Sequence, residues 1–428
     1  MARKFSQVAR APADSSRQDG LSGDPDFLWF WAGESVSLMG SQVTTVALPL
    51  VAVLTLAASP GQVGVLQAAV FLPYVGLSLL VGVWVDRHRR RLLMLVTNIV
   101  RALVISLVPL LAWLGVLRLS ALYGVALVVG LLSVVVDVAQ LAYVPSLLGR
   151  SHLSTGNSWL QASASAAQLG GPGLAGVLVA AVTAPGALLF DAGSFCVSAL
   201  SLGLIRRPEP APESTPQRVR LVREIAVGLR AVLRNPPVRA LALEGLVFNL
   251  FFQILQIAFM IYALRDRSVG APAYGLVLAG AGGGAILGAL VAPEAAKRFG
   301  YGPAFLAACA ITALTLMLIP LAAGPPALLV TTWTVAFFLS GTGDGAAGVL
   351  SYTVRQTLTP DHLLGRMSAS IRLVLYAGIP LGAILGGILT GALGARTALI
   401  VAAAGLVASV GTVWPLRSLH ALPPSGAS

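Results

Sequence analysis

The stretch Gly82-Val83-Trp84-Val85-Asp86-Arg87-His88-Arg89-Arg90-Arg91 places four arginines and one aspartate between two long apolar runs, at 62–84 and 92–115. Charged side chains are costly inside hydrocarbon, so this stretch is expected to form a short aqueous turn. Each flanking run is long enough to cross the hydrocarbon, which takes about 20 residues. The pattern therefore predicts two membrane helices joined by a basic loop.

The composition agrees with a membrane protein. The chain has 428 residues, of which 57% are hydrophobic and only 10% charged, and its mean hydropathy is +0.85. Soluble domains carry about a quarter charged residues, so soluble enzymes are excluded. We predict an all-α membrane protein with twelve transmembrane helices, near 28–56, 62–84, 92–115, 119–143, 157–183, 186–205, 238–263, 271–293, 303–323, 326–350, 368–393 and 397–416.

The formal charge of +12 would suggest a nucleic-acid partner in a soluble protein, but its distribution has another explanation. If the N-terminus is cytoplasmic, the cytoplasmic segments hold most of the arginines and lysines, including those at 87–91 and 206–239. The outer loops then hold only Arg118, Arg265, Arg267 and Arg396. This asymmetry follows the positive-inside rule. We expect a multi-pass protein of the inner (plasma) membrane with both termini in the cytoplasm and no nucleic-acid partner.

A polar, proline-rich stretch from Arg206 to Pro216 interrupts the helices near the middle of the chain. Apolar residues from Val219 to Leu233 then recur at helical spacing among arginines, which predicts an amphipathic helix on the inner membrane surface. This segment divides the chain into two six-helix bundles. The expected organisation is a disordered cytoplasmic tail (1–26), an N-terminal bundle (27–206), a linker with the amphipathic helix (207–237), a C-terminal bundle (238–416) and a cytoplasmic tail (417–428).

The two halves look duplicated. Glu34 has a counterpart in Glu244, Gly82 in Gly288, and Gly171-Pro172-Gly173 in Gly378-Ile379-Pro380-Leu381-Gly382. The offsets all lie near half the chain length. Two parallel repeats are typical of transporters whose substrate cavity lies between the repeats, so we expect two pseudo-symmetric bundles.

Three ionisable residues are expected at a common depth in the first bundle. Glu34, Arg101 and Asp137 lie on three different spans, at about 9–14 Å from the cytoplasmic end. An intramembrane charge is a functional candidate by default. If Arg101 pairs with one acid, the other could exchange protons; the alternative is a static buried salt bridge. Asn98, one turn before Arg101, is expected on the same helix face and is a candidate for the substrate cavity.

The second half offers polar candidates for substrate contacts. Glu244, Asn249 and Gln253 follow one another along span seven, and Asp344 could pair with Arg372. Hydrogen bonding between helices is the alternative role for these side chains. Asp191, in contrast, is expected in a hydrated position near the outer end of span six.

Span five contains Gly171, Pro172, Gly173 and Gly176. Proline removes a backbone hydrogen bond and glycine permits close helix approach, so these residues predict a helix kink, with simple packing as the alternative role. The chain has no phosphate-binding Gly-Lys-Ser/Thr loop, so ATP-driven transport is not expected. The four histidines lack metal-ligand spacing, and we expect no metal site.

The turn with Gly82, Asp86, Arg87, Arg90 and Arg91 resembles the loop between helices two and three of the major facilitator superfamily. The resemblance implies a gating loop that docks the two bundles together on the cytoplasmic side in the outward-facing state. A basic turn that only sets orientation is the alternative. The sequence departs from the pattern at Arg89, where glycine is frequent in the family.

Other strings resemble the efflux branch that includes the enterobactin exporter and the macrolide efflux proteins. They are 188–195, 227–236 and 356–366, and the glycines and proline of span five resemble the Gly-Pro motif of antiporters in this superfamily. The resemblance implies a proton-driven exporter of an antibiotic, siderophore or similar amphipathic molecule. We expect a monomer with no cofactor besides the proton gradient. An uptake symporter or uniporter, a lipid mover and a non-transporting sensor remain as alternatives.

Overall fold

The computed structural model describes residues 21–209, 221–359 and 361–419, and this part of the chain is helical throughout, without β-strands. The helices are α1 (Pro25–Leu50), α2 (Pro60–Gly76), α3 (Ser78–Val85), α4 (Arg90–Trp113), α5 (Leu119–Leu204), α6 (Leu221–Arg234), α7 (Pro236–Ile261), α8 (Ala271–Phe299), α9 (Tyr301–Leu316), α10 (Leu318–Leu321), α11 (Pro326–Thr357), α12 (Asp361–Leu393) and α13 (Ala395–Val410). Short 3-10 helices precede α1 (Leu21–Gly23) and follow α13 (Gly411–Ser418).

Ten helices of the described segments are long and apolar enough to cross a membrane. One of them, His152–Leu204, is 53 residues long, and the backbone leaves the helical conformation within it at Val182 and Thr183. The segments α2 and α3 have 17 and 8 residues and are separated by Leu77 alone. The predicted all-helical, multi-pass membrane architecture is therefore confirmed.

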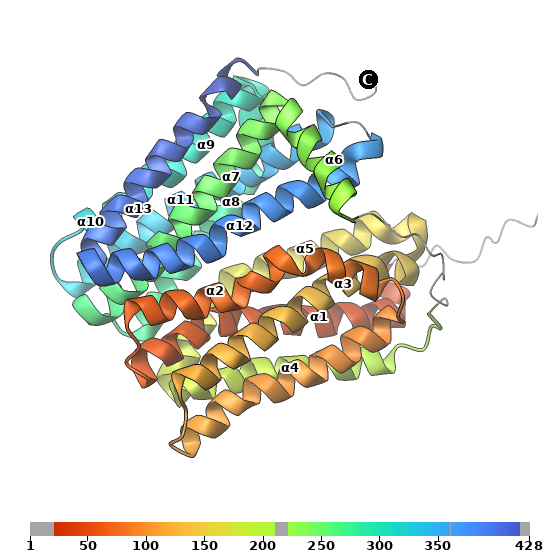
Figure 1. The fold of residues 1–428 in the computed structure, drawn as a ribbon, viewed down its shortest axis with the longest axis horizontal. Coiled ribbons are helices and arrows are strands. Elements are labelled where there is room, and N and C mark those ends of the chain that lie inside the picture. The colour runs from red at the N-terminus through yellow and green to blue at the C-terminus, as the bar shows by residue number, and fades with distance from the viewer. Residues whose placement is uncertain (1–20, 210–220, 360, 420–428) are drawn as a thin grey trace, which may run out of the picture.

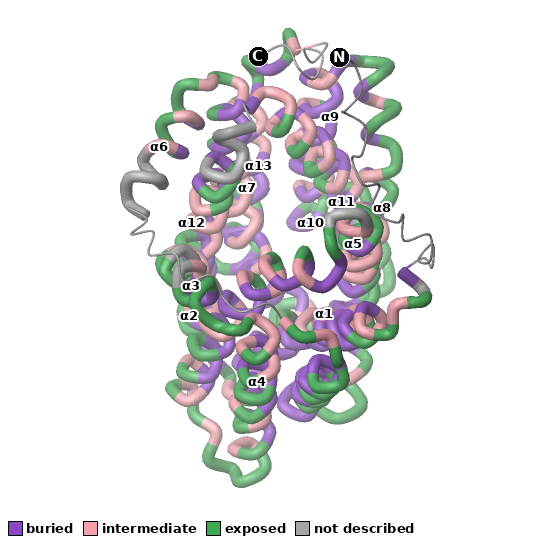
Figure 2. Tube along the Cα trace, turned by 90° about the vertical axis from the view of Figure 1, so that its right-hand side faces the viewer, coloured by how far each residue is buried: buried purple, intermediate pink, exposed green. Residues whose placement is uncertain are grey.

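The helices form two groups. Figure 1 shows α1–α5 in one group and α7–α13 in the other, converging where α2 passes α12 and diverging toward α3 and α6. Large apolar side chains remain exposed on the outer faces, among them Leu103, Leu200 and Leu290. Figure 2 shows exposed positions recurring along helices such as α4, among buried and intermediate ones. An apolar outer surface of this kind suits contact with lipid.

The two groups are repeats of each other with a constant interval of 211 residues, which is the interval from Pro25 to Pro236. These prolines begin α1 and α7, and both helices run for 26 residues. Each continues as a five-residue π-helix, Val51–Thr55 and Tyr262–Asp266, at the same interval.

The turns that follow these π-helices also match. Ala57 has φ of 49° and Ser268 has φ of 51°, again at the same interval. A positive φ is uncommon for residues other than glycine, so its recurrence at equivalent positions is specific evidence of duplication. We call the two repeats, on either side of α6, the first half and the second half.

This interval corrects the residue pairs that the sequence suggested. The equivalents at the observed interval are Gly245 for Glu34, Pro293 for Gly82 and Ala383 for Pro172. Glu244 is one position from the equivalent of Glu34. One residue corresponds to about 100° of rotation around an α-helix, so the two glutamates point in different directions within their halves.

The halves touch at two glycine crossings on the membrane side opposite to the two chain ends, which we call the far side. A Cβ added to Gly64 of α2 would lie 2.4 Å from the Ala383 oxygen and 3.1 Å from Cα of Gly387 in α12. A Cβ added to Gly275 of α8 would lie 2.4 Å from the Pro172 oxygen and 3.1 Å from Cα of Gly176. The two crossings are equivalent under the repeat, and each brings backbone against backbone as only small residues allow.

Arg265 also joins the two halves on the far side. Its Nη2 donates hydrogen bonds to the backbone oxygens of Val53, at 3.4 Å, and Ala58, at 2.7 Å. These bonds run from the second half to the turn between α1 and α2 in the first half. Together with the glycine crossings, they close the far side of the molecule.

The predicted amphipathic helix is present as α6, although residues 219 and 220 lie outside the described segments. Val232 of α6 is buried in a cluster with Met367 and Ile371 of α12. This end of α6 therefore packs on the second half rather than only on a membrane surface. Residues 25 and 26, which were expected in the N-terminal tail, belong to α1, because the Asp24 side chain accepts hydrogen bonds from the amides of Asp26 and Phe27.

The first prediction concerns the glycine crossings. We expect Gly275→Ala to weaken far-side closure by about 1–3 kcal/mol, because the added methyl group overpacks against backbone. Hydrogen–deuterium exchange at the start of α2, at the other crossing, should accelerate. Gly124→Ala is the control, since no atom lies within 4 Å of its added Cβ. Equal exchange in the two variants would show that the crossings do not hold the halves together.

Candidate functional site

The loop after α3 is not docked on the second half in this conformation. No atom lies within 4 Å of a Cβ added to Gly82, and Asp86 and Arg87 are exposed. Neither residue forms an ion pair within the described segments. The close approach and the pairing that the sequence suggested for Gly82 and Asp86 are thus absent here.

Arg90 and Arg91 instead attach the loop to the end of the first half. The backbone amides of Arg90 and Arg91 donate to the two carboxylate oxygens of Glu209, at 2.7 and 3.1 Å. The Arg91 guanidinium donates to the backbone oxygens of Leu202, at 2.7 Å, and Gly203, at 3.0 Å. A carboxylate at the first turn of α4 is favourable, because the free amides there carry partial positive charge. Sequence analysis missed Glu209, whose only signal was an acid in a polar linker.

A cavity of about 190 Å³ lies inside the first half. Glu34, Arg101 and Asp137 all line it, together with Asp191, so the structure brings the three predicted residues to one place. The remaining lining combines aliphatic side chains such as Leu38, Val70 and Val129 with hydroxylic and aromatic ones, from Ser37, Ser41, Thr44, Thr45, Ser133, Phe71 and Tyr74. The cavity can therefore accept polar and aromatic groups together.

Arg101 is held without an ion pair. Its side chain is 6% exposed, and Nη1 and Nη2 donate to Asn98 Oδ1, at 3.4 Å, and Ser41 Oγ, at 3.3 Å. Its guanidinium carbon lies 3.9 Å from the centre of the Phe195 ring, which is a close cation–π contact. The predicted salt bridge with Glu34 or Asp137 is absent, since ion pairs in the described segments do not include Arg101.

The Asn98 side chain hydrogen-bonds to Arg101 and does not line the cavity. It is fully buried, and its Nδ2 donates to Ser198 Oγ at 3.0 Å while its Oδ1 accepts from Arg101. It does not line the first-half cavity. The expectation that Asn98 shares a face with Arg101 is confirmed, but the side chain ties α4 to the last part of α5.

Glu34 is the least satisfied carboxyl of this cavity. It is only 6% exposed, yet it has no hydrogen bond or ion pair with any described residue. A carboxylate without hydrogen-bond partners is costly in a low-dielectric interior.

Asp191 corrects the sequence interpretation. It is 1% exposed and accepts hydrogen bonds from Thr44 Oγ1, at 2.5 Å, and Ser194 Oγ, at 3.0 Å. A hydrated interfacial position is therefore wrong. The sequence carried a usable signal, because Ser194 lies three residues after Asp191 and faces the same side of a helix.

Asp137 lies at the boundary between the halves. Its Oδ2 accepts a hydrogen bond of 2.9 Å from the Tyr74 hydroxyl, and it lines a second, smaller cavity with Arg372 of α12. Arg372 was expected to pair with Asp344, but Asp344 lines a different cavity and the described ion pairs include neither residue. The rotation of α12 about its axis decides which acid lies near Arg372, and the sequence does not reveal that rotation.

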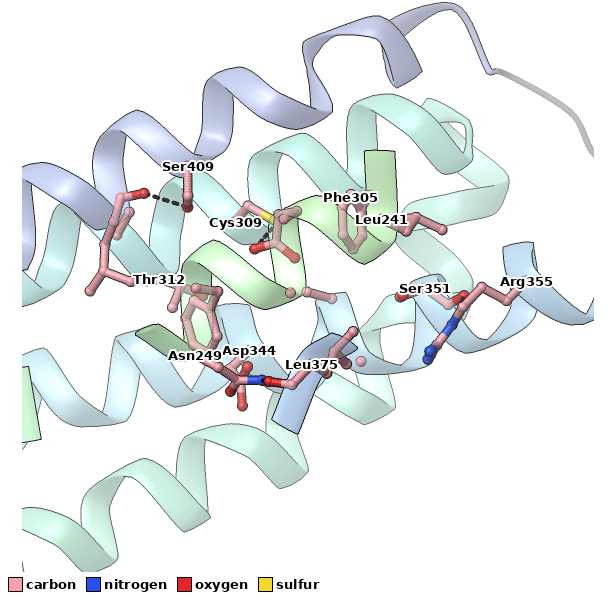
Figure 3. A pocket seen from close by; sticks show the side chains of 17 residues that line it. Leu241, Asn249, Phe305, Cys309, Thr312, Asp344, Ser351, Arg355, Leu375 and Ser409 are labelled. Atoms are coloured by element: carbon pink, nitrogen blue, oxygen red, sulfur yellow. Dashed lines mark hydrogen bonds between the residues drawn. The ribbon is translucent and has the colours of Figure 1, made fainter. Parts of the chain in front are cut away.

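The second half has a polar cavity of its own, also of about 190 Å³ (Figure 3). Glu244, Asn249 and Asp344 line it, and Cys309 Sγ lies 3.9 Å from Glu244 Oε1. Asn249 also donates to the backbone oxygen of Leu375 at 3.0 Å, so it contributes to packing as well as to the lining. Gln253 does not line this cavity and lies against Gly382 of α12.

The glycines of span five build the interface between the halves. Gly176 and the Pro172 oxygen meet α8, whereas a Cβ added to Gly171 would lie 2.3 Å from Cβ of Gln42 in α1. Gly173 is less crowded, with Cβ of Ala279 at 3.8 Å. The backbone stays helical at Pro172, so the motif acts by close approach rather than by breaking the helix. Over the described residues, no group of three or more histidine, cysteine, aspartate or glutamate side chains could hold a metal ion.

Two repeated helical halves, each with a polar cavity inside an apolar shell, define a membrane transporter of the major facilitator class and not an enzyme. Within that superfamily, the chain belongs to the transmembrane secretion effector family, whose model matches residues 23–423.

Relatives in this class include known efflux pumps. The chain is 27% identical to the multidrug efflux pump Tap of Mycolicibacterium fortuitum over 369 residues, covering 83% of this chain and 87% of the pump. It is 28% identical to Tap of Mycobacterium tuberculosis over 398 residues, covering 90% of this chain and 92% of the pump.

Solved structures agree on the fold. The chain superposes on a bacterial homologue of the iron transporter ferroportin in its inward-facing state with a TM-score of 0.73, at 17% identity, covering 92% of this chain and 98% of that one. The TM-score is 0.57 against the outward-facing state, at 17% identity, covering 92% and 99% of the two chains.

The second prediction concerns Arg101. We expect Arg101→Lys to lower the free energy of unfolding by about 1–3 kcal/mol, because lysine cannot keep both the stacking on Phe195 and the forked hydrogen bonds. Thermal unfolding in detergent would measure the loss. Arg118→Lys, at an exposed far-side position, is the matched control. If the two variants unfold at the same temperature, the contacts of Arg101 do not stabilise the first half.

Proposed function

We propose that this protein is a proton-coupled secondary transporter that exports a small amphipathic organic compound by alternating access. Membership of the secretion effector family and the likeness to multidrug efflux pumps support the direction of transport. The single observation that carries the proton coupling is the buried, unpartnered carboxyl of Glu34 in a cavity shared with Arg101 and Asp137.

The proposed architecture has twelve spans in two six-helix bundles. The ten candidate spans become eleven when His152–Leu204 is divided at Thr183, and twelve when α2 and α3 are taken as one broken span. Six spans then precede α6 and six follow it. The distribution of arginines supports cytoplasmic termini in the plasma membrane, and the protein is proposed to work as a monomer without a cofactor.

With that orientation, the far side is the outer side of the membrane and the structure is inward-facing. The glycine crossings and Arg265 close the outer side. On the cytoplasmic side, the position of Gly82 faces open space. In this state, a compound from the cytoplasm is proposed to reach the polar cavities of both halves.

The two cavities are proposed to have different roles in coupling proton movement to export. Glu34 receives a proton from outside when the transporter faces outward and releases it to the cytoplasm in the present state. Arg101, fixed by Phe195 and Asn98, keeps the positive potential beside Glu34 constant and so favours release of the proton. Glu244, Asn249 and Asp344 of the second half are proposed to contact the substrate.

The basic loop at 82–91 is proposed to act in the outward-facing state. Gly82, Asp86 and Arg87 are free of second-half contacts here, which suits a latch that engages only when the cytoplasmic side closes. Arg90 and Arg91 hold the loop to the first half through Glu209 and the end of α5. The loop would thus move with the first half as a unit.

A transport assay tests the proposal. Cells with and without the protein are compared on a panel of antibiotics, and the compound whose tolerance rises is added to proteoliposomes that contain a pH-sensitive dye. We expect compound-driven proton movement that falls to the level of empty vesicles in Glu34→Gln, because the neutral amide cannot carry a proton. Glu294→Gln, at the exposed pair of Glu294 and Lys297, should retain full coupling.

Other outcomes distinguish the alternatives. Accumulation of the compound in cells would indicate uptake, and activity that depends on lipid headgroups would indicate a lipid mover. No flux of any compound would favour a sensor. Unchanged proton movement in Glu34→Gln would remove the assignment of this residue.

The latch yields a separate prediction. Asp86→Asn should slow export severalfold, because it weakens the outward-facing state, which the present structure does not represent. Its thermal stability should equal that of the wild type, since Asp86 is exposed and makes no ion pair in the described structure. Asp266→Asn, an exposed acid on the far side, is the control. An unaltered export rate in Asp86→Asn would leave the loop with a topological role only.

A further inference from the structure

Four side chains from both halves meet in the middle of the molecule. The Tyr74 hydroxyl of α2 donates to Asp137 Oδ2 at 2.9 Å, and the Tyr74 ring packs edge-on against Tyr376 of α12, with ring centres 5.6 Å apart and planes at 75°. Arg372, one helical turn before Tyr376, completes the lining of a cavity of about 70 Å³. The first half thus contributes an acid and the second half a base to one small, shared space.

Neither charge forms an ion pair within its own half in the described segments. Arg101, the nearby cation of the first half, is already occupied by Asn98, Ser41 and Phe195. In the second half, Glu244 and Asp344 line a separate cavity. Asp137 and Arg372 line one cavity from opposite halves.

The location of this cluster matters. On its outer side, the halves are closed by the contacts of Gly64 with Gly387 and of Gly176 with Gly275. Toward the chain ends, the position of Gly82 meets open space. The cluster therefore lies between the closed outer side and the open position of Gly82, and its contact between Tyr74 and Tyr376 joins the two halves there.

We propose that Asp137 and Arg372 attract each other across the two halves and, together with Tyr74 and Tyr376, hold the inward-facing state. Asp137 is then a residue of domain closure, and proton exchange is left to Glu34. Neutralising Asp137, by a cationic group of the substrate, removes the attraction and releases the outer side. Glu34, Arg101 and Asp191 are the other charged groups of the adjoining first-half cavity, and all three belong to the same half as Asp137. This inference rests on the alternating access of the proposed function.

Distances between spin labels test the closure directly. Labels at Thr55→Cys and Asp266→Cys, in a Cys196→Ser, Cys309→Ser background, report on the outer side, because both positions are exposed and end the equivalent π-helices. Asp137→Asn and Arg372→Gln should each raise the ratio of long to short distances about fivefold or more. The double variant should shift no further than the larger single effect, because both substitutions remove one interaction.

A control and two contrary results complete the test. Arg396→Gln removes a guanidinium that donates only to Pro320 within the second half, and it should leave the distances unchanged. Wild-type distances in either single variant, or additive shifts in the double variant, would overturn the proposal. The readout needs no substrate, so a protein that shows these shifts but exports nothing would refute the proposed function and leave the closure contact standing.

Discussion

The structure depends on two places where the backbone of one half meets the backbone of the other. Hydrocarbon offers no hydrophobic drive for helices to associate, so they associate through close packing and interhelical polar contacts. Gly64 and Gly387, and their equivalents Gly275 and Gly176, allow that closeness because they have no side chain to separate the helices. Because no side chains interlock at these glycine crossings, the two halves can separate there at low cost. A transporter that alternates between two states requires such a contact.

Charges inside the molecule are stabilised in ways that fit this movement. Arg101 is held entirely by residues of the first half, namely Asn98, Ser41 and Phe195, so its position does not change when the halves separate. Asp191 is likewise satisfied by Thr44 and Ser194. Glu34 alone among these groups is buried without a hydrogen bond or ion pair to a described residue.

The repeat also shows how the two halves have diverged. The residue equivalent to Arg101 at the interval of 211 is Thr312, which donates to backbone oxygens and carries no charge. The second-half cavity contains the acids Glu244 and Asp344, and its arginine, Arg355, comes from α11 rather than from the place that corresponds to Arg101. Duplication supplied the same scaffold twice, and substitutions at equivalent positions gave the two cavities different electrostatic character. This divergence suits a division between proton exchange in one half and substrate contact in the other.

The sequence by itself determined the membrane class, the position of almost every span and the existence of a repeat, because each follows from the length and polarity of local segments. It also brought Glu34, Arg101 and Asp137 to one level, since depth follows from counting residues along a helix. Only the tertiary structure decided that Arg101 stacks on Phe195, that Arg372 faces Asp137 and that the repeat interval pairs Glu34 with Gly245. Those facts depend on how helices rotate about their axes and cross one another, and contacts between residues far apart in the chain set both.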